Sequence, residues 1–237
     1  MNALFITATG TDCGKTFVTS GLLRHLRALG LPARALKPVV SGFDEAAPEG
    51  SDPAELLAAM GEPVTAQSLA TIAPLRFKAP LAATMAARLE GRSLTLADIL
   101  RACEAALQEP RGPLLIEGAG GVMSPFAEGS TCLDAIKALG LPCLLVTGTY
   151  LSAISHTLTA LAAMRAAGCA PRAIAVNESD GSRVSLAETM AELAAFAPGV
   201  VAVAIGRGER DFAALARVCG LAANAVTSIQ MSGSDKS

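Results

Sequence analysis

A lysine and a threonine stand side by side in a glycine-containing loop near the start of the chain. Residues 8–16 read Ala-Thr-Gly-Thr-Asp-Cys-Gly-Lys-Thr. In such a loop, backbone N–H groups and the N-terminus of the next helix face phosphate oxygens. The lysine neutralises their charge, and the threonine hydroxyl ligates the accompanying Mg²⁺. Lys15 and Thr16 therefore predict a nucleotide phosphate site, with a chance Gly-Lys-Thr in an ordinary loop as the alternative.

The surrounding pattern favours the phosphate site. Residues 4–6 form a short apolar run before the loop, and apolar residues recur at helical spacing over residues 18–29, so the loop joins a strand to a helix. The usual motif has glycine at the position that Thr9 occupies here, so the signature is imperfect. Cys13, directly before Gly14, is expected to carry a reactive thiol, or else to pack inertly beneath the loop.

A second lysine, Lys37, lies at the end of the next expected strand, residues 33–39. Ligands of open α/β sheets bind outside the carboxyl ends of the strands, so Lys37 and Ser41 are expected to face the phosphate loop. The alternative for Lys37 is a solvated lysine at the sheet edge.

Two carboxylates are candidates for the same site. Asp52, followed by Pro53 and Glu55, matches the N-cap of a helix with a capping box, and this role alone explains Asp52. Glu117 ends an apolar run and precedes Gly-Ala-Gly-Gly, which suits a metal-side acid followed by an anion-binding loop. A flexible turn with an exposed glutamate is the alternative.

Two later positions offer polar groups for other parts of a ligand. Residues 148–152 form a helix entrance whose free N–H groups are suited to a carboxylate. Asn177 ends the expected strand 172–176, where its amide is suited to the donor–acceptor edge of adenine, or else is an ordinary turn asparagine. His156 is expected to be a packed or surface histidine.

Composition restricts the class of protein. The chain has 237 residues, 51% of them apolar, and a net charge of −2, with no basic patch for nucleic acid or an anionic membrane. Its six cysteines are widely spaced, which indicates reduced thiols rather than disulfides or zinc. The first residues lack a basic leader pattern. We expect a cytoplasmic protein whose partners are small molecules or a second copy of itself.

Strands and helices are expected to alternate throughout. We predict a single doubly wound, mostly parallel sheet with helices on both faces, of the P-loop NTPase type, over residues 1–227. Residues 61–80 are expected to be irregular, and residues 228–237 to form a disordered polar tail. Expected strands are residues 4–6, 33–39, 113–116, 143–147, 172–176 and 200–205. Expected helices include residues 81–89, 95–108, 133–139, 152–167 and 211–218, with capping boxes at Thr95 and Ser185.

Several blocks together resemble the dethiobiotin synthetase family. They are residues 5–16, residues 36–42 (Leu-Lys-Pro-Val-Val-Ser-Gly), residues 117–121, residues 154–156 and the strand that ends at Asn177. The resemblance covers almost the whole chain and departs from the usual pattern at Ala8, Gly10 and Ser155. Partition-type regulatory ATPases share the expected fold but have an early lysine where Gly10 stands. A silent regulatory nucleotide-binding domain is disfavoured by Lys37 and Glu117, and a cobyrinate-type amide ligase by the chain length.

The resemblance implies an ATP-dependent ligase that carboxylates 7,8-diaminononanoate with CO2 and closes the ring of dethiobiotin, as a homodimer with active sites at the interface. It implies catalytic roles for Lys37, Lys15 and Thr11, and Mg²⁺ held by Thr16, Asp52 and Glu117. The implied substrate-binding residues are Thr11, Lys37, Ser41, Tyr150, Leu151, Ser152 and Ser155. The implied ATP-binding residues are Asp12, Cys13, Gly14, Lys15, Thr16, Phe17, Asp52, Glu117, Gly118, Ala119, Gly120, Asn177, Glu178, Ala204, Ile205 and Gly206.

Overall fold

A six-stranded parallel sheet runs through the computed structural model, which describes residues 3–221. Its order is β10-β9-β8-β1-β5-β2, and each neighbouring pair is parallel. β1 lies between β5 and β8, so the loop that follows β1 opens near the middle of the carboxyl edge of the sheet. The strands are β1 (Ala3–Ala8), β2 (Arg34–Leu36), β5 (Leu114–Glu117), β8 (Cys143–Thr147), β9 (Ala173–Asn177) and β10 (Ala202–Ile205).

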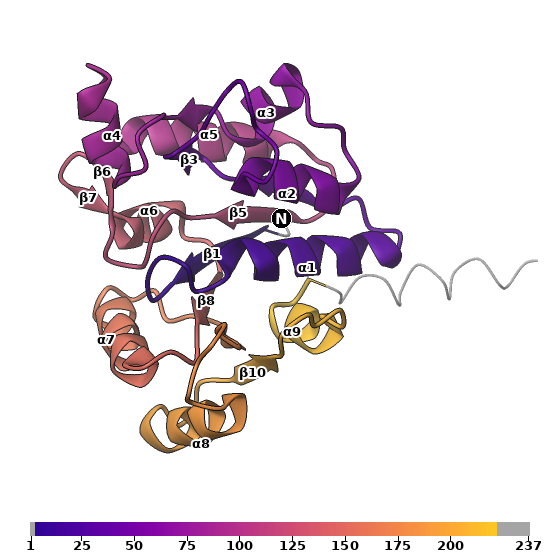
Figure 1. Cartoon of the computed structure of the whole chain (residues 1–237), viewed down its shortest axis with the longest axis vertical. Helices are drawn as coiled ribbons and strands as arrows, with labels where there is room; N and C mark the ends of the chain where they lie inside the picture. Colours follow the sequence, from indigo (N-terminus) through magenta and orange to yellow (C-terminus); the bar gives the residue numbers. More distant parts are fainter. Residues whose placement is uncertain (1–2, 222–237) are drawn as a thin grey trace, which may run out of the picture.

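Helices cover both faces of this sheet (Figure 1). Alternate residues of β1 point to opposite faces, so Leu4 and Ile6 belong to one apolar cluster and Phe5 to another. Burial on both faces explains the continuous apolar runs of the strands. The cluster of Leu4 is covered by α1 (Lys15–Ala28), α2 (Asp52–Met60), α3 (Ala66–Ile72) and α9 (Ala213–Val218). The cluster of Phe5 is covered by α4 (Ala83–Leu89), α5 (Leu96–Gln108), α6 (Cys132–Leu139), α7 (Ala153–Ala166) and α8 (Leu186–Phe196).

The predicted α/β architecture is therefore confirmed, and so are the capping boxes of two helices. Thr95 and Asp98 cap α5 reciprocally, as do Ser185 and Glu188 at α8.

No helix within residues 3–221 has both the length and the apolar character that a bilayer crossing requires. The expected tail, residues 228–237, and the boundary at residue 227 lie outside the described residues.

The predicted cap of α2 is wrong by one residue. Ser51, not Asp52, is the N-cap, and its Oγ accepts a hydrogen bond from the backbone N–H of Ala54 at 3.4 Å. Asp52 is instead the first helical residue. Because Ser51 satisfies the helix end, the Asp52 carboxylate is available for another partner.

The predictions for residues 33–39 and 61–80 are also wrong in part. The chain leaves the large sheet after Leu36, because the next backbone N–H, of Lys37, donates to the Ile72 carbonyl at 2.8 Å, and Pro38 has no N–H. β3 (Val39–Val40) then pairs with β4 (Leu75–Arg76) in a separate two-stranded sheet. The region expected to be irregular thus contains α3 and β4, and a hairpin of β6 (Pro125–Ala127) and β7 (Ser130–Thr131) was not predicted.

The capping carboxylate of α5 gives a prediction about acid stability. Hydrogen bonds from the hydroxyl and backbone N–H of Thr95 lower the pKa of Asp98. A folded-state pKa below the unfolded value gives stability that is present above the unfolded pKa and lost as the pH falls through the folded pKa. We expect Asp98→Asn to lower the free energy of unfolding by roughly 0.5 kcal/mol at pH 7. The difference from wild type should close below about pH 4.

Urea unfolding at pH 7 and at pH 3 measures this difference. Glu104→Gln is the matched control, because Glu104 is an exposed carboxylate of the same helix outside its capping box. A loss in Asp98→Asn that is equally large at both pH values would contradict the prediction.

Candidate active site

The loop between β1 and α1 is shaped by two residues with positive φ. Asp12 has a φ of 57° and Gly14 a φ of 86°. A Cβ on Gly14 would lie 2.1 Å from Nδ2 of Asn177, which in turn donates to the Cys13 carbonyl at 3.2 Å. Glycine is therefore required at position 14 for both its backbone angle and its space. The end of β9 packs directly against the phosphate-binding loop.

Lys37 is buried between two carboxylates that come from different elements. Its ammonium donates to Glu117 Oε1 at 2.7 Å and forms an ion pair with Asp52 at the start of α2. The Thr16 hydroxyl donates to the same Glu117 oxygen at 2.8 Å. Burial opposes the charge on Lys37, but Glu117 and Asp52 outweigh it and raise the pKa of Lys37. The lysine is therefore held in its charged form.

The charges around Lys37 change the pKa values of its neighbours. Burial, followed by the repulsion of Lys37, lowers the pKa of Lys15, whose Nζ donates to the Gly10 carbonyl at 3.2 Å. Burial alone would raise the pKa of Asp52, but the Lys37 ammonium lowers it. Burial and then Asp52 raise the pKa of Glu55. Two ammonium groups and three carboxyl groups thus share one small region.

The oxygen atoms of this region fit a magnesium ion. Oε2 of Glu117 is buried and has no hydrogen-bond partner among the described residues. It lies in a group of hard oxygen donors that includes the Thr16 hydroxyl and the Asp52 carboxylate. Within residues 3–221 no three His, Cys, Asp or Glu side chains gather to form a metal cluster. Few protein ligands suit Mg²⁺, which completes its shell with water and phosphate oxygens.

A cavity of about 720 Å³ lies in front of these groups. It brings together many of the residues predicted from the sequence: Thr11, Asp12, Gly14, Lys15, Thr16, Phe17, Lys37, Ser41, Asp52, Ala119 and Gly120. Glu117 is fully buried behind this set and reaches it through Lys37 and Thr16. The remaining wall includes side chains that were not predicted: Glu55, Pro80, Leu81, Ala83, Ser124 and Pro125.

Other predicted residues do not line this cavity. Tyr150, Leu151, Ser152 and Ser155 lie at the start of α7. Asn177, Glu178, Ala204, Ile205 and Gly206 lie at the ends of β9 and β10. The carboxylate of Glu178 accepts a hydrogen bond from the Arg207 backbone N–H at 3.0 Å, and the Ile205 side chain is buried in the core. Any contact of Ile205 with a ligand is thus limited to its backbone.

Two of the glycines after Glu117 allow close packing against other parts of the chain. A Cβ on Gly121 would lie 2.9 Å from the Thr9 carbonyl oxygen and from the Gly10 nitrogen. A Cβ on Gly118 would lie 2.9 Å from the sulfur of Cys132. The sequence suggested that these glycines allow the backbone to approach a ligand. In the structure, Gly121 allows one loop to approach the other.

Of the two roles predicted for Cys13, a reactive thiol or an inertly packed side chain, the structure favours the second. Cys13 is only 2% exposed, and its sulfur lies beneath the loop, 3.4 Å from Thr9 Oγ1 and 3.6 Å from the Thr11 carbonyl. Cys169 is the least buried of the six cysteines. Cys13 therefore fits the inert packing role that was the alternative.

Two polar contacts near the loop were missed in the sequence. The Tyr150 hydroxyl lies 3.2 Å from Thr9 Oγ1 and 2.9 Å from Nδ1 of His156. The family resemblance implies only a substrate-binding role for Tyr150, and the sequence predicts His156 only as a packed or surface histidine. The replacement of the usual glycine by Thr9 was the one signal of an additional side-chain contact at this position.

Comparisons with known proteins agree with this geometry. A family model described as AAA domain matches residues 2–206. The "ATP-dependent dethiobiotin synthetase BioD" of Caulobacter sp. (strain K31) is 49% identical over 218 residues, or 91% of this chain and 93% of that protein. The protein of the same name from Methylobacterium nodulans is 48% identical over 213 residues, or 88% of this chain and 94% of that protein.

Solved structures resemble the chain in fold alone. The MinC:MinD cell division complex of Aquifex aeolicus has a TM-score of 0.53 at 12% identity and covers 100% of this chain and 98% of that one. A ParA family ATPase from Chlorobium tepidum has a TM-score of 0.50 at 13% identity, with coverage of 97% and 92%. These are P-loop ATPase folds, as the sheet order and the loop indicate.

The contact between Gly14 and Asn177 gives a prediction that needs no knowledge of the reaction. Gly30→Ala is the matched control, because Gly30 also has a positive φ, 74°, but no atom of residues 3–221 lies within 4 Å of an added Cβ. We expect Gly30→Ala to lower the free energy of unfolding by about 1 kcal/mol through backbone strain alone. Gly14→Ala should lower it by about 3 kcal/mol, because it also displaces Asn177 and breaks its hydrogen bond.

Chemical denaturation of both variants measures the two losses. Adding Asn177→Ala to Gly14→Ala should restore part of the stability, because the clashing amide is gone. Equal losses in the two single variants would show that the Asn177 contact does not restrict position 14.

Proposed function

Since the chain belongs to the family of ATP-dependent dethiobiotin synthetases, we propose that it closes the ureido ring of dethiobiotin from 7,8-diaminononanoate, CO2 and ATP. One amine adds to CO2 and loses a proton, which gives a carbamate. The γ-phosphoryl group of ATP passes to a carbamate oxygen and releases ADP. The second amine then attacks the carbamoyl carbon and loses a proton, and phosphate leaves as the ring closes.

The observation that best supports this reaction is the buried ammonium of Lys37 beside the phosphate-binding loop. Lys37 and Lys15 line one cavity, and Glu117 and Asp52 fix Lys37 in place before any substrate binds. A fixed positive charge stabilises the negative charge of a carbamate and of a phosphoryl group in transfer without reorganisation. Phosphoryl transfer needs positioning and charge rather than a protein nucleophile, and these residues supply both.

The remaining cavity residues are assigned by their positions. Thr11 and Ser41 face the same cavity as Lys37, where their hydroxyls would bind the diamine or its carbamate. Thr16, Asp52 and Glu117 would hold Mg²⁺, which, when bound, neutralises charge on the phosphates. Asn177 and the ends of β9 and β10 would contact the adenine side of ATP, because Asn177 already lies against the phosphate-binding loop.

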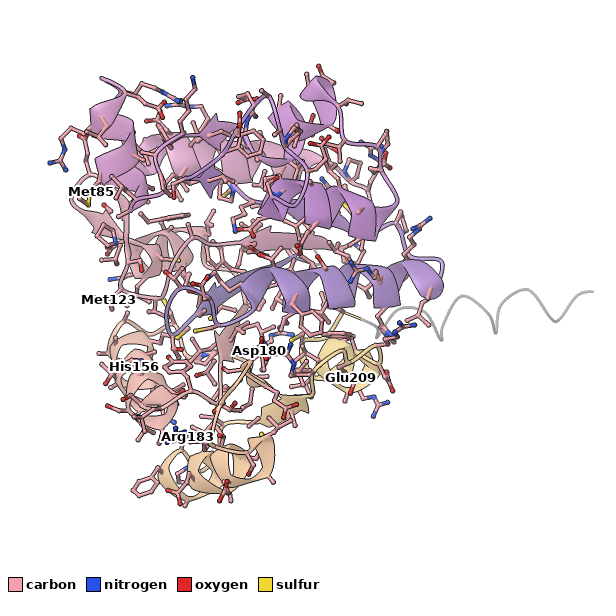
Figure 2. All side chains as sticks on the ribbon, in the orientation of Figure 1. Met85, Met123, His156, Asp180, Arg183 and Glu209 are labelled. Atoms are coloured by element: carbon pink, nitrogen blue, oxygen red, sulfur yellow. The ribbon has the colours of Figure 1, made fainter. Side chains whose placement is uncertain are left out.

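The substrate is long, and its carboxylate is remote from its amines. The start of α7, with Tyr150, Leu151, Ser152 and Ser155, would bind that carboxylate. These residues do not line the cavity of their own chain, so they would serve the cavity of a second copy in a homodimer. Figure 2 shows Met85, Met123 and His156 toward the side of the molecule where the phosphate-binding loop turns. Met85 and Met123 are 49% and 56% exposed, as suits an apolar interface.

The reaction itself is tested with the purified protein, diaminononanoate, bicarbonate, ATP and Mg²⁺. We expect mass spectrometry to detect dethiobiotin. Lys37→Ala should leave ATP affinity nearly unchanged but lower turnover by about 100-fold or more, because its charge acts mainly on the reacting oxygens. Lys78→Ala, which removes an exposed lysine outside the cavity, is the control and should keep full turnover. ATP turnover without dethiobiotin would favour a partition-type ATPase instead.

The dimer is tested by sedimentation at the concentration of the assay. We expect twice the chain mass of 23.9 kDa. Met123→Glu should shift the protein toward the monomer and lower activity, because it puts a charge into the apolar interface. Phe196→Glu is the matched control, since Phe196 is also exposed but belongs to α8. A fully active wild-type monomer would contradict the shared active site.

A further inference from the structure

A path of hydrogen-bonding side chains leads from the phosphate-binding loop to the surface of α7. Thr9 Oγ1 lies 3.4 Å from the sulfur of Cys13 and 3.2 Å from the Tyr150 hydroxyl. That hydroxyl lies 2.9 Å from Nδ1 of His156, an exposed residue in the first turns of α7 (Figure 2). The Thr9–Tyr150 contact in this path joins two residues that are 141 positions apart in the sequence.

The residues around Tyr150 hold its side chain in place. A Cβ on Gly148 would lie 2.8 Å from the Tyr150 ring and 2.4 Å from the Ser179 hydroxyl, so only glycine allows this approach. Thr149 and Ser179 exchange hydrogen bonds in both directions, at 3.0 and 3.1 Å. The segment that carries Tyr150 is thus tied to the turn after β9.

The rings of Tyr150 and His156 are also in contact, with centroids 5.6 Å apart. Burial raises the pKa of Tyr150, so its hydroxyl keeps its proton and can donate a hydrogen bond. On the other side, Thr9 is held by the hydroxyl of Thr147 at 3.2 Å. A glycine at position 9 would offer no side chain to any of these groups. The threonine at this position gives the loop a side-chain anchor.

We infer that His156 and Tyr150 are positioning residues that set the phosphate-binding loop for its nucleotide through the Thr9 hydroxyl. His156 fixes the hydroxyl of Tyr150, and Tyr150 restrains Thr9. Thr9 restrains Cys13, which precedes the Gly14 and Lys15 backbone N–H groups that face phosphate. The inference rests on the proposed function only for the identity of the nucleotide, ATP.

The test is calorimetric ATP binding to the full chain, together with steady-state kinetics. Tyr150→Phe removes the hydroxyl and keeps the ring, and His156→Ala removes an exposed side chain that the fold does not depend on. We expect each to weaken ATP binding about fivefold to tenfold, the effect of one hydrogen bond. Because both residues act on one path, the double variant should bind ATP no more weakly than Tyr150→Phe alone. His156→Asn should recover most of the affinity, since its amide can reach the position of Nδ1.

The control is Thr159→Val, which removes an exposed α7 hydroxyl that donates to the Ser155 carbonyl at 2.9 Å. It should leave ATP affinity at the wild-type value. Unchanged ATP affinity in Tyr150→Phe and His156→Ala, or losses that multiply in the double variant, would overturn the inference. So would a fall in melting temperature that accounts for the whole effect. A wild type that binds ATP but makes no dethiobiotin would refute the proposed function, and the binding data would still decide this inference.

Discussion

The pairing of the buried Lys37 ammonium with Glu117 and Asp52 determines how three elements meet. A buried ion without a partner is strongly unfavourable, so the end of β2, the end of β5 and the start of α2 must converge at one point. The hydroxyl of Thr16, a residue of α1, donates a hydrogen bond to the carboxylate of Glu117. The charge of Lys37 is therefore paired within the protein. Oε2 of Glu117, which has no hydrogen-bond partner among the described residues, remains available to a cation.

Most of the fold was predictable because its signals are local. Apolar runs, glycine turns and capping boxes such as Thr95 with Asp98 are each contained within a few residues. The wrong predictions concern places where two neighbouring residues could each serve as the helix cap, or where the capping box has an unusual residue. Ser51 and Asp52 are both good caps, and only the three-dimensional ion pair assigns the aspartate elsewhere. The helix α3 was missed because its capping box uses Ser68 in place of the usual glutamate or glutamine.

Part of the candidate site was predictable because its motifs lie at the ends of strands that belong to one sheet. Parallel strands bring their carboxyl ends to one edge, so Lys15, Lys37 and Glu117 could be placed together without coordinates. The depth of each side chain could not be predicted in this way. Cys13 lies beneath its loop, and Gly121 packs against the loop that follows β1. Likewise, the contacts of Thr9, Tyr150 and His156 depend on the angle at which β8 leads into α7, which no short pattern encodes.

The central position of β1 has a consequence for the nascent chain. Phe5 pairs with Ile116 on one side and with Cys143 on the other. β1 is thus an apolar segment that leaves the ribosome well before either of its neighbouring strands has been synthesised. Pairings this distant in sequence slow folding, and an unpaired apolar strand is prone to aggregate while it waits. β1, which lies between β5 and β8 in the finished sheet, therefore depends on protection during synthesis.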